Sequence, residues 1–393
     1  MNPKRICLIT NYNQYESKRV FTAELAKALD ECGIATLILD WAKSKSTFFK
    51  QIQDFKPDLL LSFNSFQPLS NGEYIWDILK IPTLFVIVDP VIYYANIPPS
   101  PYLYLSCVDR NDAQMLADNG YTNVFFWPHA TSTKPLTYEE RIYDVVLTGS
   151  CYDYESLKES APPQLLPILD AATELVLGPN CISIAQAIHS TWHLANLPQQ
   201  EIDFKQLFYL IDYYTRGLDR INLVKSLKDC KVHIFGELGQ DHPSAKKSWD
   251  YYLGNLPNIT LHPALNFSDA LKIQRQAKIC LNSMPFFKNG SHERILTSLE
   301  AGALPLTSDS IWTHEQFSHL NDILIYTPNS YSHLNELIQN LLSNPQQLQT
   351  LISNGRQKVI SHHTWISRAR GLCPLDPCQR AKPFGNRFPP SGQ

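Results

Sequence analysis

The sequence has no long hydrophobic run and no excess of charge of either sign. Its 393 residues contain no stretch of about 18 apolar side chains, which argues against a transmembrane helix. The 34 basic and 37 acidic residues leave a formal net charge of -3 at pH 7, which gives no electrostatic argument for nucleic-acid binding. The first apolar run covers only Ile6 to Ile9, too short for the core of a signal peptide, so we expect a buried strand there and a cytoplasmic location.

Several short catalytic motifs are also absent. No P-loop, GxSxG, HExxH or GxGxxG pattern occurs, so the sequence carries no signal of a nucleotide hydrolase, a serine hydrolase, a zinc protease or a dinucleotide-binding enzyme. No DxD pair of acids stands at the end of an expected strand, since Asp309 is followed by Ser310. We therefore expect neither a metal ion nor a cofactor.

The nine cysteines form no regular framework. Four of them lie inside apolar, strand-like runs, as is typical of buried reduced thiols in a cytosolic protein, namely Cys7, Cys107, Cys230 and Cys280. Cys373 and Cys378 are close together but lack a second pair of ligands, so we expect no zinc site.

The length and composition indicate a globular protein of two domains. Hydrophobic residues make up 44% of the chain and charged residues 18%, and 393 residues exceed one ordinary hydrophobic core. Apolar runs alternate with helical patterns in the first third, which is typical of a parallel sheet covered by helices. The expected strands of this part cover residues 5–10, 35–39, 59–61, 83–88, 103–108 and 124–126.

The remainder predicts a second α/β domain with a helical insertion. A strand at 143–147 precedes about 156–215, which is helical in pattern, and strands follow at 232–235, 258–261, 279–282, 303–306 and 323–326. We expect an α/β fold of two Rossmann-like domains that face each other across a cleft. The predicted boundaries are 1–130 for the first domain, 131–140 for a linker, 141–366 for the second domain and 367–393 for a disordered tail rich in Pro, Gly and Arg.

The segment 287–310 carries the most informative chemistry. A polar loop leads into a helix that begins near Glu293, and its residues are Asn289, Gly290, Ser291 and His292. A loop-to-helix junction presents unpaired N–H groups and the positive end of the helix dipole, which suit a diphosphate. The prediction requires that the backbone ahead of Ile295 opens into the interdomain space with these amides available to an anion.

Three side chains of this segment fit the same ligand. Ser291 can cap the helix, and Arg294 can direct two hydrogen bonds to phosphate oxygens. Glu300 lies two turns after Glu293 on roughly the same face, where a carboxylate can accept hydrogen bonds from ribose hydroxyls. The alternative is that Ser291 and Glu293 only cap a helix and that Glu300 is a solvated acid.

The run from His292 to Thr307 resembles the nucleotide-sugar motif of GT-B glycosyltransferases, in particular glycosyl transferases group 1 and the CgeB-like branch. Other landmarks similar to that fold are DVVLTGS at 144–150, VHIFG at 232–236 and WPHA at 127–130. The resemblance implies a nucleoside-diphosphate sugar on the second domain, with Arg294 on the diphosphate and Glu300 on the ribose. Many retaining members have seven residues between two glutamates, whereas six separate Glu293 from Glu300, so the sugar-contacting role does not carry over to Glu293 directly.

The resemblance also implies further donor contacts. Gly149, Ser150 and Gly236 follow the first two strands of the second domain, where a ligand approaches the backbone closely, and His262 falls where the base would lie. Ordinary strand-end turns and a loop histidine are the alternatives. The first loop, Asn11 to Tyr15, lacks glycines and offers amides and phenols, so we expect it to face the acceptor.

The candidate general bases are Asp89 and His129, which both follow strands of the first domain, together with Glu293. Arg216 and Arg220 could reach a phosphate, although a solvated helix face is the favoured interpretation for both. The sequence thus predicts a metal-independent glycosyltransferase that uses a nucleotide sugar and an unknown glycan, protein or small-molecule acceptor. A catalytically inactive binding protein of the same fold and a sugar-nucleotide epimerase are the alternatives.

Overall fold

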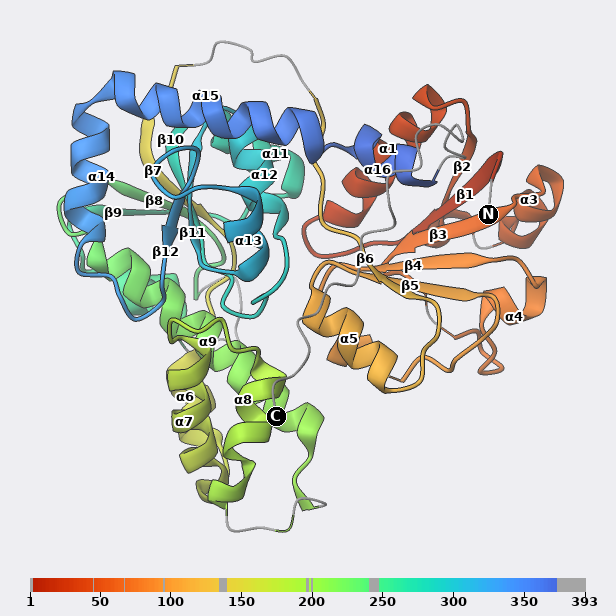
Figure 1. Cartoon of the computed structure of the whole chain (residues 1–393), viewed down its shortest axis with the longest axis horizontal. Coiled ribbons are helices and arrows are strands. Elements are labelled where there is room, and N and C mark those ends of the chain that lie inside the picture. The colour runs from red at the N-terminus through yellow and green to blue at the C-terminus, as the bar shows by residue number, and fades with distance from the viewer. Residues whose placement is uncertain are drawn as a thin grey trace.

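The chain folds into two parallel sheets of six strands each, with helices on both faces (Figure 1). The computed structural model describes residues 3–44, 46–66, 68–94, 96–133, 140–195, 198, 201–239 and 247–372. The strand order is β2-β1-β3-β4-β5-β6 in the first sheet and β12-β11-β10-β7-β8-β9 in the second, and all neighbouring strands are parallel. The predicted fold class of two facing Rossmann-like units is confirmed.

The first sheet follows directly from its apolar strands. Strands β3 and β4 are buried along their whole length, because helices cover both faces of the sheet. The strands are β1 (Arg5–Thr10), β2 (Ala35–Asp40), β3 (Leu59–Phe63), β4 (Thr83–Ile87), β5 (Leu103–Cys107) and β6 (Val124–Phe126). The helices are α1 (Ser17–Glu31), α2 (Trp41–Ser44), α3 (Phe48–Phe55), α4 (Ile75–Leu79), α5 (Arg110–Asp118) and the short 3-10 helix η1 (Val91–Tyr94).

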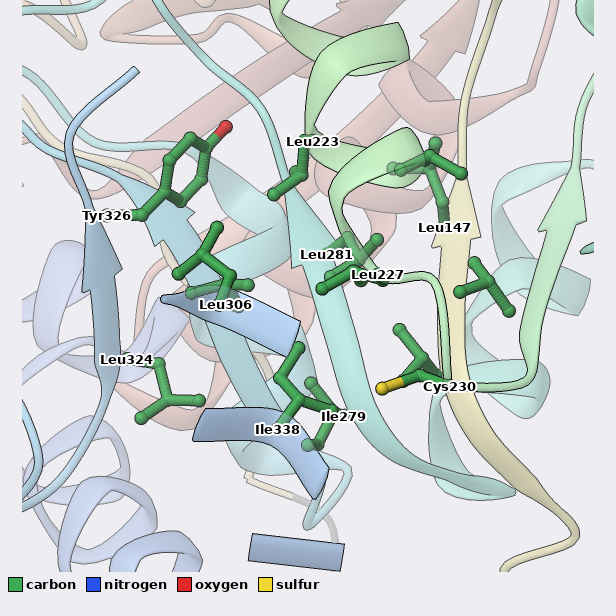
Figure 2. Close-up of a cluster of buried hydrophobic side chains, with 14 of the residues drawn as sticks. Leu147, Leu223, Leu227, Cys230, Ile279, Leu281, Leu306, Leu324, Tyr326 and Ile338 are labelled. Atoms are coloured by element: carbon green, nitrogen blue, oxygen red, sulfur yellow. The ribbon is translucent and has the colours of Figure 1, made fainter. Parts of the chain in front are cut away.

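The second sheet packs around a core of leucine and isoleucine side chains, including Leu147, Leu281 and Leu306 (Figure 2). Its strands are β7 (Tyr143–Thr148), β8 (Val232–Phe235), β9 (Ile259–His262), β10 (Ala277–Asn282), β11 (Leu304–Ser308) and β12 (Leu324–Tyr326). Its helices are α10 (Trp249–Leu253), α11 (Phe267–Arg275), α12 (Glu293–Glu300), α13 (Ile311–Gln316), α14 (Leu334–Ser343) and α15 (Pro345–His362).

The predicted helical insertion follows β7 and forms a lobe of its own below the second sheet in Figure 1. Its elements are α6 (Tyr154–Ser160), η2 (Pro163–Leu165), α7 (Leu166–Val176), α8 (Ile184–Thr191), η3 (Trp192–Ala195) and α9 (Phe204–Ser226). Helix α9 runs past the expected end at 215, so the pattern around 223–227 is its last turn. The hydrophobic cluster of the lobe also takes in Ile92 of η1, so the insertion packs against the first sheet's unit.

The last helix, α16 (Trp365–Leu372), packs on α1 of the first unit (Figure 1). The ring of Trp365 lies 5.7 Å from that of Phe63, and Ala369 is fully buried. The prediction of a disordered tail from residue 367 is therefore wrong for 367–372. The face of α16 that carries Trp365 and Ala369 packs on α1, and this packing stabilises the helix. Residues 373–393, with Cys373 and Cys378, lie outside the described residues.

Two segments cross between the units side by side. The amide of Thr131 donates to the carbonyl of His363 at 3.0 Å, and the amide of Trp365 donates to the carbonyl of Thr131 at 3.0 Å. Most of the expected linker, residues 134–139, lies outside the described residues, and the exact domain boundaries stay a prediction. Within the described ranges, no helix combines the length and apolar character that crossing a membrane requires.

Candidate functional site

A pocket of about 140 Å³ lies between the two units. It is formed where strands β1, β7, β8 and β9 end, which is the edge at which open α/β sheets bind ligands. The side chains of α12 form another wall. The lining residues are Tyr15, Ser17, Thr148, Gly149, Phe235, Gly236, Ala264, Leu265, Phe267, Ala270, Gln274, Glu293, Arg294 and Thr297.

Two glycines let side chains approach the backbone closely at this edge. A Cβ atom at Gly149 would lie 3.5 Å from Nη1 of Arg220 and 3.7 Å from Nη2 of Arg294. A Cβ at Gly236 would collide with the indole nitrogen of Trp249, which donates to the carbonyl of Gly149 at 3.1 Å. Both expected close-approach glycines therefore line the pocket, Gly149 against two guanidinium groups and Gly236 against an indole ring.

Two arginines supply positive charge beside Gly149. Nη1 of Arg294 donates to Oδ1 of Asn282 at 3.0 Å, and Nη1 of Arg220 donates to the carbonyl of Ser150 at 2.6 Å. Burial lowers the pKa of Arg294, and the nearby carboxylate of Glu293 partly offsets that effect. Nε of Arg220 has no hydrogen-bond partner among the described residues, so this group can still donate to an anion.

Arg216 belongs to the same region but is already paired. Its guanidinium group binds both carboxylate oxygens of Asp212, at 2.6 and 2.7 Å, and stacks on the ring of Phe286 at 3.6 Å. Arg216 and Arg220 are both buried, so the favoured interpretation of a solvated helix face is wrong for both. Their position on α9 brings the insertion into the candidate site.

The loop ahead of α12 corrects the central sequence prediction. The amide of Asn289 donates to Oδ2 of Asp109 at 2.8 Å, and the amide of Ser291 donates to the carbonyl of Val108 at 3.0 Å. These amides are therefore occupied by the end of the first sheet and are not available to an anion. Gly290 is packed against Val108 and Asp109 so tightly that a Cβ atom there would lie 2.6 Å from the Val108 carbonyl oxygen.

The cap of α12 also differs from the expectation. The amide of Arg294 donates to Nδ1 of His292 at 3.3 Å, so His292 caps the helix instead of Ser291. The hydroxyl of Ser291 accepts from the amide of His129 at 2.8 Å. Ser291 thus joins the two units, and the positive groups beside Gly149 are the side chains of Arg220 and Arg294.

His129 and Glu293 meet at this junction. Nε2 of His129 lies 3.9 Å from Oε2 of Glu293, and the same oxygen lies 3.1 Å from Nδ1 of His292. Burial lowers the pKa of His129 to about 3, although its contact with the backbone of Ser291 opposes that shift. Burial raises the pKa of Glu293, against the effect of Arg294, so a proton on Glu293 is favoured relative to a carboxyl group in water.

Asp89 follows β4 and faces the same region. It accepts a hydrogen bond from Nδ2 of Asn64 at 2.7 Å, and the carbonyl of Asn64 accepts one from Nζ of Lys18 at 2.9 Å. Burial raises the pKa of Asp89, while the positive charges of Arg216 and Lys18 lower it. The negative charge of Asp89 in turn contributes to the raised pKa of Glu293, which His129 contacts.

Three predicted donor contacts lie away from the pocket wall. Glu300 is buried at the last residue of α12 and is not among the described residues that line the pocket, whereas Thr297 is. His262 stacks on Phe235 at 4.2 Å, outside that wall, and its Nε2 lies 3.0 Å from Nδ1 of His233. Ser150 likewise lies outside the wall, and its hydroxyl contacts the phenol of Tyr15 at 3.0 Å.

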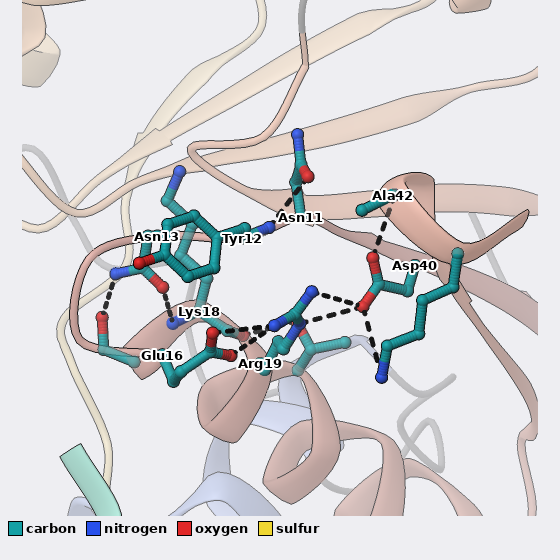
Figure 3. A network of polar contacts seen from close by, with 11 residues as sticks. Asn11, Tyr12, Asn13, Glu16, Lys18, Arg19, Asp40 and Ala42 are labelled. Atoms are coloured by element: carbon teal, nitrogen blue, oxygen red, sulfur yellow. Dashed lines mark hydrogen bonds and ion pairs between the residues drawn. The ribbon is translucent and has the colours of Figure 1, made fainter. Parts of the chain in front are cut away.

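The first loop divides between the two units. The loop leads into α1, where Arg19 binds Glu16 at 2.6 Å and Asp40 of β2 at 2.8 Å (Figure 3). Its end, Tyr15, lines the pocket and donates to Glu237 at 3.1 Å. Tyr15 therefore lies beside Gly149 and Gly236 in the pocket, and the expectation that the loop faces the acceptor stays a prediction.

The described part of the chain has no group of three or more His, Cys, Asp or Glu side chains arranged to hold a metal ion. The positive groups beside Gly149 are arginines of α9 and α12.

Comparisons with known proteins agree with this geometry. The profile of a family described as glycosyl transferase-like matches residues 220–373, which begin at Arg220 and include α12. No curated protein sequence matches the chain.

Solved structures cover nearly the whole chain at low identity. A glycosyltransferase from Rickettsia africae is 11% identical with a TM-score of 0.52, covering 94% of this chain and 97% of that one. HepE from Anabaena, in complex with UDP-glucose, is 9% identical with a TM-score of 0.52, covering 94% and 98%. Sucrose-phosphate synthase from Thermosynechococcus elongatus is 12% identical with a TM-score of 0.52, covering 94% and 97%. These likenesses show that the two facing units have the GT-B fold.

The buried histidines predict acid sensitivity of the fold. The pKa of His129 is lowered from 6.5 to about 3, so the unfolded chain binds this proton at higher pH than the folded chain. The stability that the neutral ring contributes is present above about pH 6.5 and is lost as the pH falls towards 3. One such group changes the free energy of unfolding by up to about 1.4 kcal/mol per pH unit.

His129→Asn keeps a donor near Nδ1 but does not titrate. We expect the slope of the unfolding free energy between pH 4 and 6, measured by urea denaturation, to fall by up to about 1.4 kcal/mol per unit. His193→Asn, at an exposed position of the insertion, is the matched control and should leave the slope unchanged. Equal slopes for wild type and His129→Asn would contradict the burial of a neutral His129.

Proposed function

We propose that the chain is a metal-independent glycosyltransferase that transfers a sugar from a nucleoside-diphosphate sugar to an acceptor. The observation that carries the proposal is the pocket at the carboxyl edge, where Arg220 and Arg294 approach Gly149 within 4 Å of its Cβ position. The match of a glycosyl transferase-like profile to 220–373 and the UDP-glucose complex of HepE support this choice of ligand. The CgeB-like branch rests on the motif around Arg294 alone.

The charge of the leaving group explains why arginines would line the donor site. Breaking the bond between the sugar and the diphosphate places negative charge on the phosphate oxygens. Arg220 is buried and Arg294 is partly buried, and the Ser150 carbonyl and Asn282 hold them in place, so they can bind that charge with little reorganisation. In this proposal the arginine pair takes the role that a divalent cation has in other phosphate-transfer sites.

Glu293 is the candidate that contacts the reacting sugar. It lines the pocket beside Arg294, whereas neither His129 nor Asp89 is among the described residues of that wall. His129 is held by Ser291 at 3.0 Å and lies behind the Glu293 carboxyl group, so we assign it a positioning role. Asp89 raises the pKa of Glu293 through its charge, so we assign it a positioning role as well.

The pocket between the two units is small. Its volume of about 140 Å³ is below the about 300–1,000 Å³ typical of pockets for drug-sized ligands. We propose that the units open about the paired crossing at Thr131 and Thr364 and close on the donor, which excludes water from the activated sugar.

Removing the charge of Arg294 tests the donor site. A thermal-shift screen of nucleotide sugars identifies the donor, and titration calorimetry then compares wild type with Arg294→Met. We expect the dissociation constant to rise about ten- to hundredfold, since a charge-assisted hydrogen bond contributes about 1.5–3 kcal/mol. Arg370→Met on the exposed side of α16 is the control and should bind as wild type does. Unchanged affinity in Arg294→Met would count against the proposed diphosphate site.

The Glu293 assignment is tested by kinetics. Glu293→Gln keeps the size of the side chain but cannot ionise, and we expect kcat for transfer to fall about 10²- to 10⁴-fold with donor affinity nearly unchanged. Glu174→Gln, at an exposed position of α7, is the matched control. Full activity of Glu293→Gln would refute its place at the reacting sugar. Donor binding without transfer in the wild type would instead identify a binding protein.

A further inference from the structure

A cavity larger than the donor pocket lies outside it. It has a volume of about 680 Å³ and lies between α5 of the first unit and helices α8 and α9 of the insertion. This volume falls within the about 300–1,000 Å³ range of ligand pockets, unlike the donor pocket. The insertion therefore creates a second interdomain space that the two facing sheets alone would not form.

Acidic side chains line this cavity, and burial raises the pKa of the Asp109 and Asp112 carboxyl groups. Its wall carries the carboxyl groups of Asp109, Asp112 and Asp118, and no lysine or arginine of the described residues lines it. Anionic ligands such as phosphates, nucleotides and uronic acids are therefore disfavoured there, because no cation offsets their charge.

The remaining wall combines aromatic rings with amides. Phe204 and Phe208 of α9 contribute rings, and the ring of His189 lies 5.5 Å from that of Phe204. Asn111 and Gln186 add side-chain amides. Flat apolar surfaces next to carboxyl and amide groups fit a sugar ring, whose apolar face stacks on aromatics while its hydroxyl groups exchange hydrogen bonds.

The cavity borders the candidate reaction centre through shared residues. Phe286 lines the cavity, and its ring stacks on Arg216 at 3.6 Å and lies 6.1 Å from the ring of His292. Asp109 lines the cavity and also accepts the amide hydrogen of Asn289 at 2.8 Å. A ligand in this space would thus lie against the segment that leads directly into Glu293.

We propose that this cavity binds an uncharged saccharide as the acceptor, which rests on the proposed function of the donor pocket. In this proposal the insertion helps to form the acceptor site, since α8 and α9 make the wall that faces α5. The arginines of α9 face the donor, and Phe204 and Phe208 of the same helix face the acceptor.

The main test variant places a large side chain in the cavity and leaves the other lining residues unchanged. Ala185 lines the cavity from the first turn of α8, and Ala185→Trp would occupy the space, whereas Ser190→Trp places the same ring at an exposed position of that helix. Saccharide binding to the full chain is measured without donor by saturation-transfer NMR and calorimetry, with lactose, maltose and diacetylchitobiose as neutral probes and glucuronate as the anionic probe.

We expect at least one neutral probe to bind, glucuronate to bind at least tenfold more weakly, and Ala185→Trp to weaken the neutral probe at least tenfold. Ser190→Trp should bind as wild type does. Phe204→Leu is a smaller change that removes one ring, and it should weaken binding at least threefold. This variant still tests the inference if Ala185→Trp does not fold.

The inference is overturned if no neutral probe binds the wild-type chain, or if both cavity variants bind the saccharide as tightly as wild type. UDP-glucose is titrated separately into each protein, and its affinity should change less than twofold in Ala185→Trp. Saccharide binding that depends on the cavity supports the inference even where no nucleotide sugar binds. A failure to bind any nucleotide sugar would contradict only the proposed donor site.

Discussion

The contact between the loop ahead of α12 and the end of β5 determines how the site is assembled. Val108 and Asp109 accept the amide hydrogens of Ser291 and Asn289, and the amide of Arg110 donates to the carbonyl of Asn289 at 3.1 Å. These bonds hold the start of α12 against the first sheet. As a result, a helix of the second unit presents Glu293 and Arg294 to a space that the first unit also lines.

Burial at this junction sets the chemistry of its charged groups. Glu293 is placed among His129, His292 and Arg294 with little solvent, which raises its pKa and lowers those of both histidines. Buried charges cost several kcal/mol unless they are paired, and in the proposed function the diphosphate pairs with the arginines beside Gly149. The insertion contributes to this balance through Arg220, and it encloses a separate acidic cavity on its other side.

The sequence was most informative for the elements and least informative for contacts between them. Fully apolar strands such as β3 and β4 can only be buried on both faces, so the parallel sheets were predictable from local pattern. The partners of the Asn289 and Ser291 amides are about 180 residues away in the chain, and no local pattern reveals them. The same holds for α16, because the partners of its apolar side chains are on α1, far away in the sequence.

Helix geometry explains the outcome for Glu300. It shares a face with Glu293, as the spacing of seven indicated, but seven residues at about 1.5 Å each displace it by about 10 Å along the axis. Thr297, one turn from Glu293, is the residue that reaches the pocket. For Arg220 the sequence favoured a solvated helix face over a phosphate contact, because its burial depends on Tyr152, which stacks 4.9 Å away, and on the Ser150 carbonyl.

The most direct test of the central claim is a crystal structure of the chain with a bound nucleoside-diphosphate sugar, or with UDP where the sugar is hydrolysed. The account predicts that the diphosphate oxygens lie within hydrogen-bonding distance of the guanidinium groups of Arg220 and Arg294, next to the backbone of Gly149. A diphosphate bound anywhere else on the chain, with these arginines making only protein contacts, would contradict it.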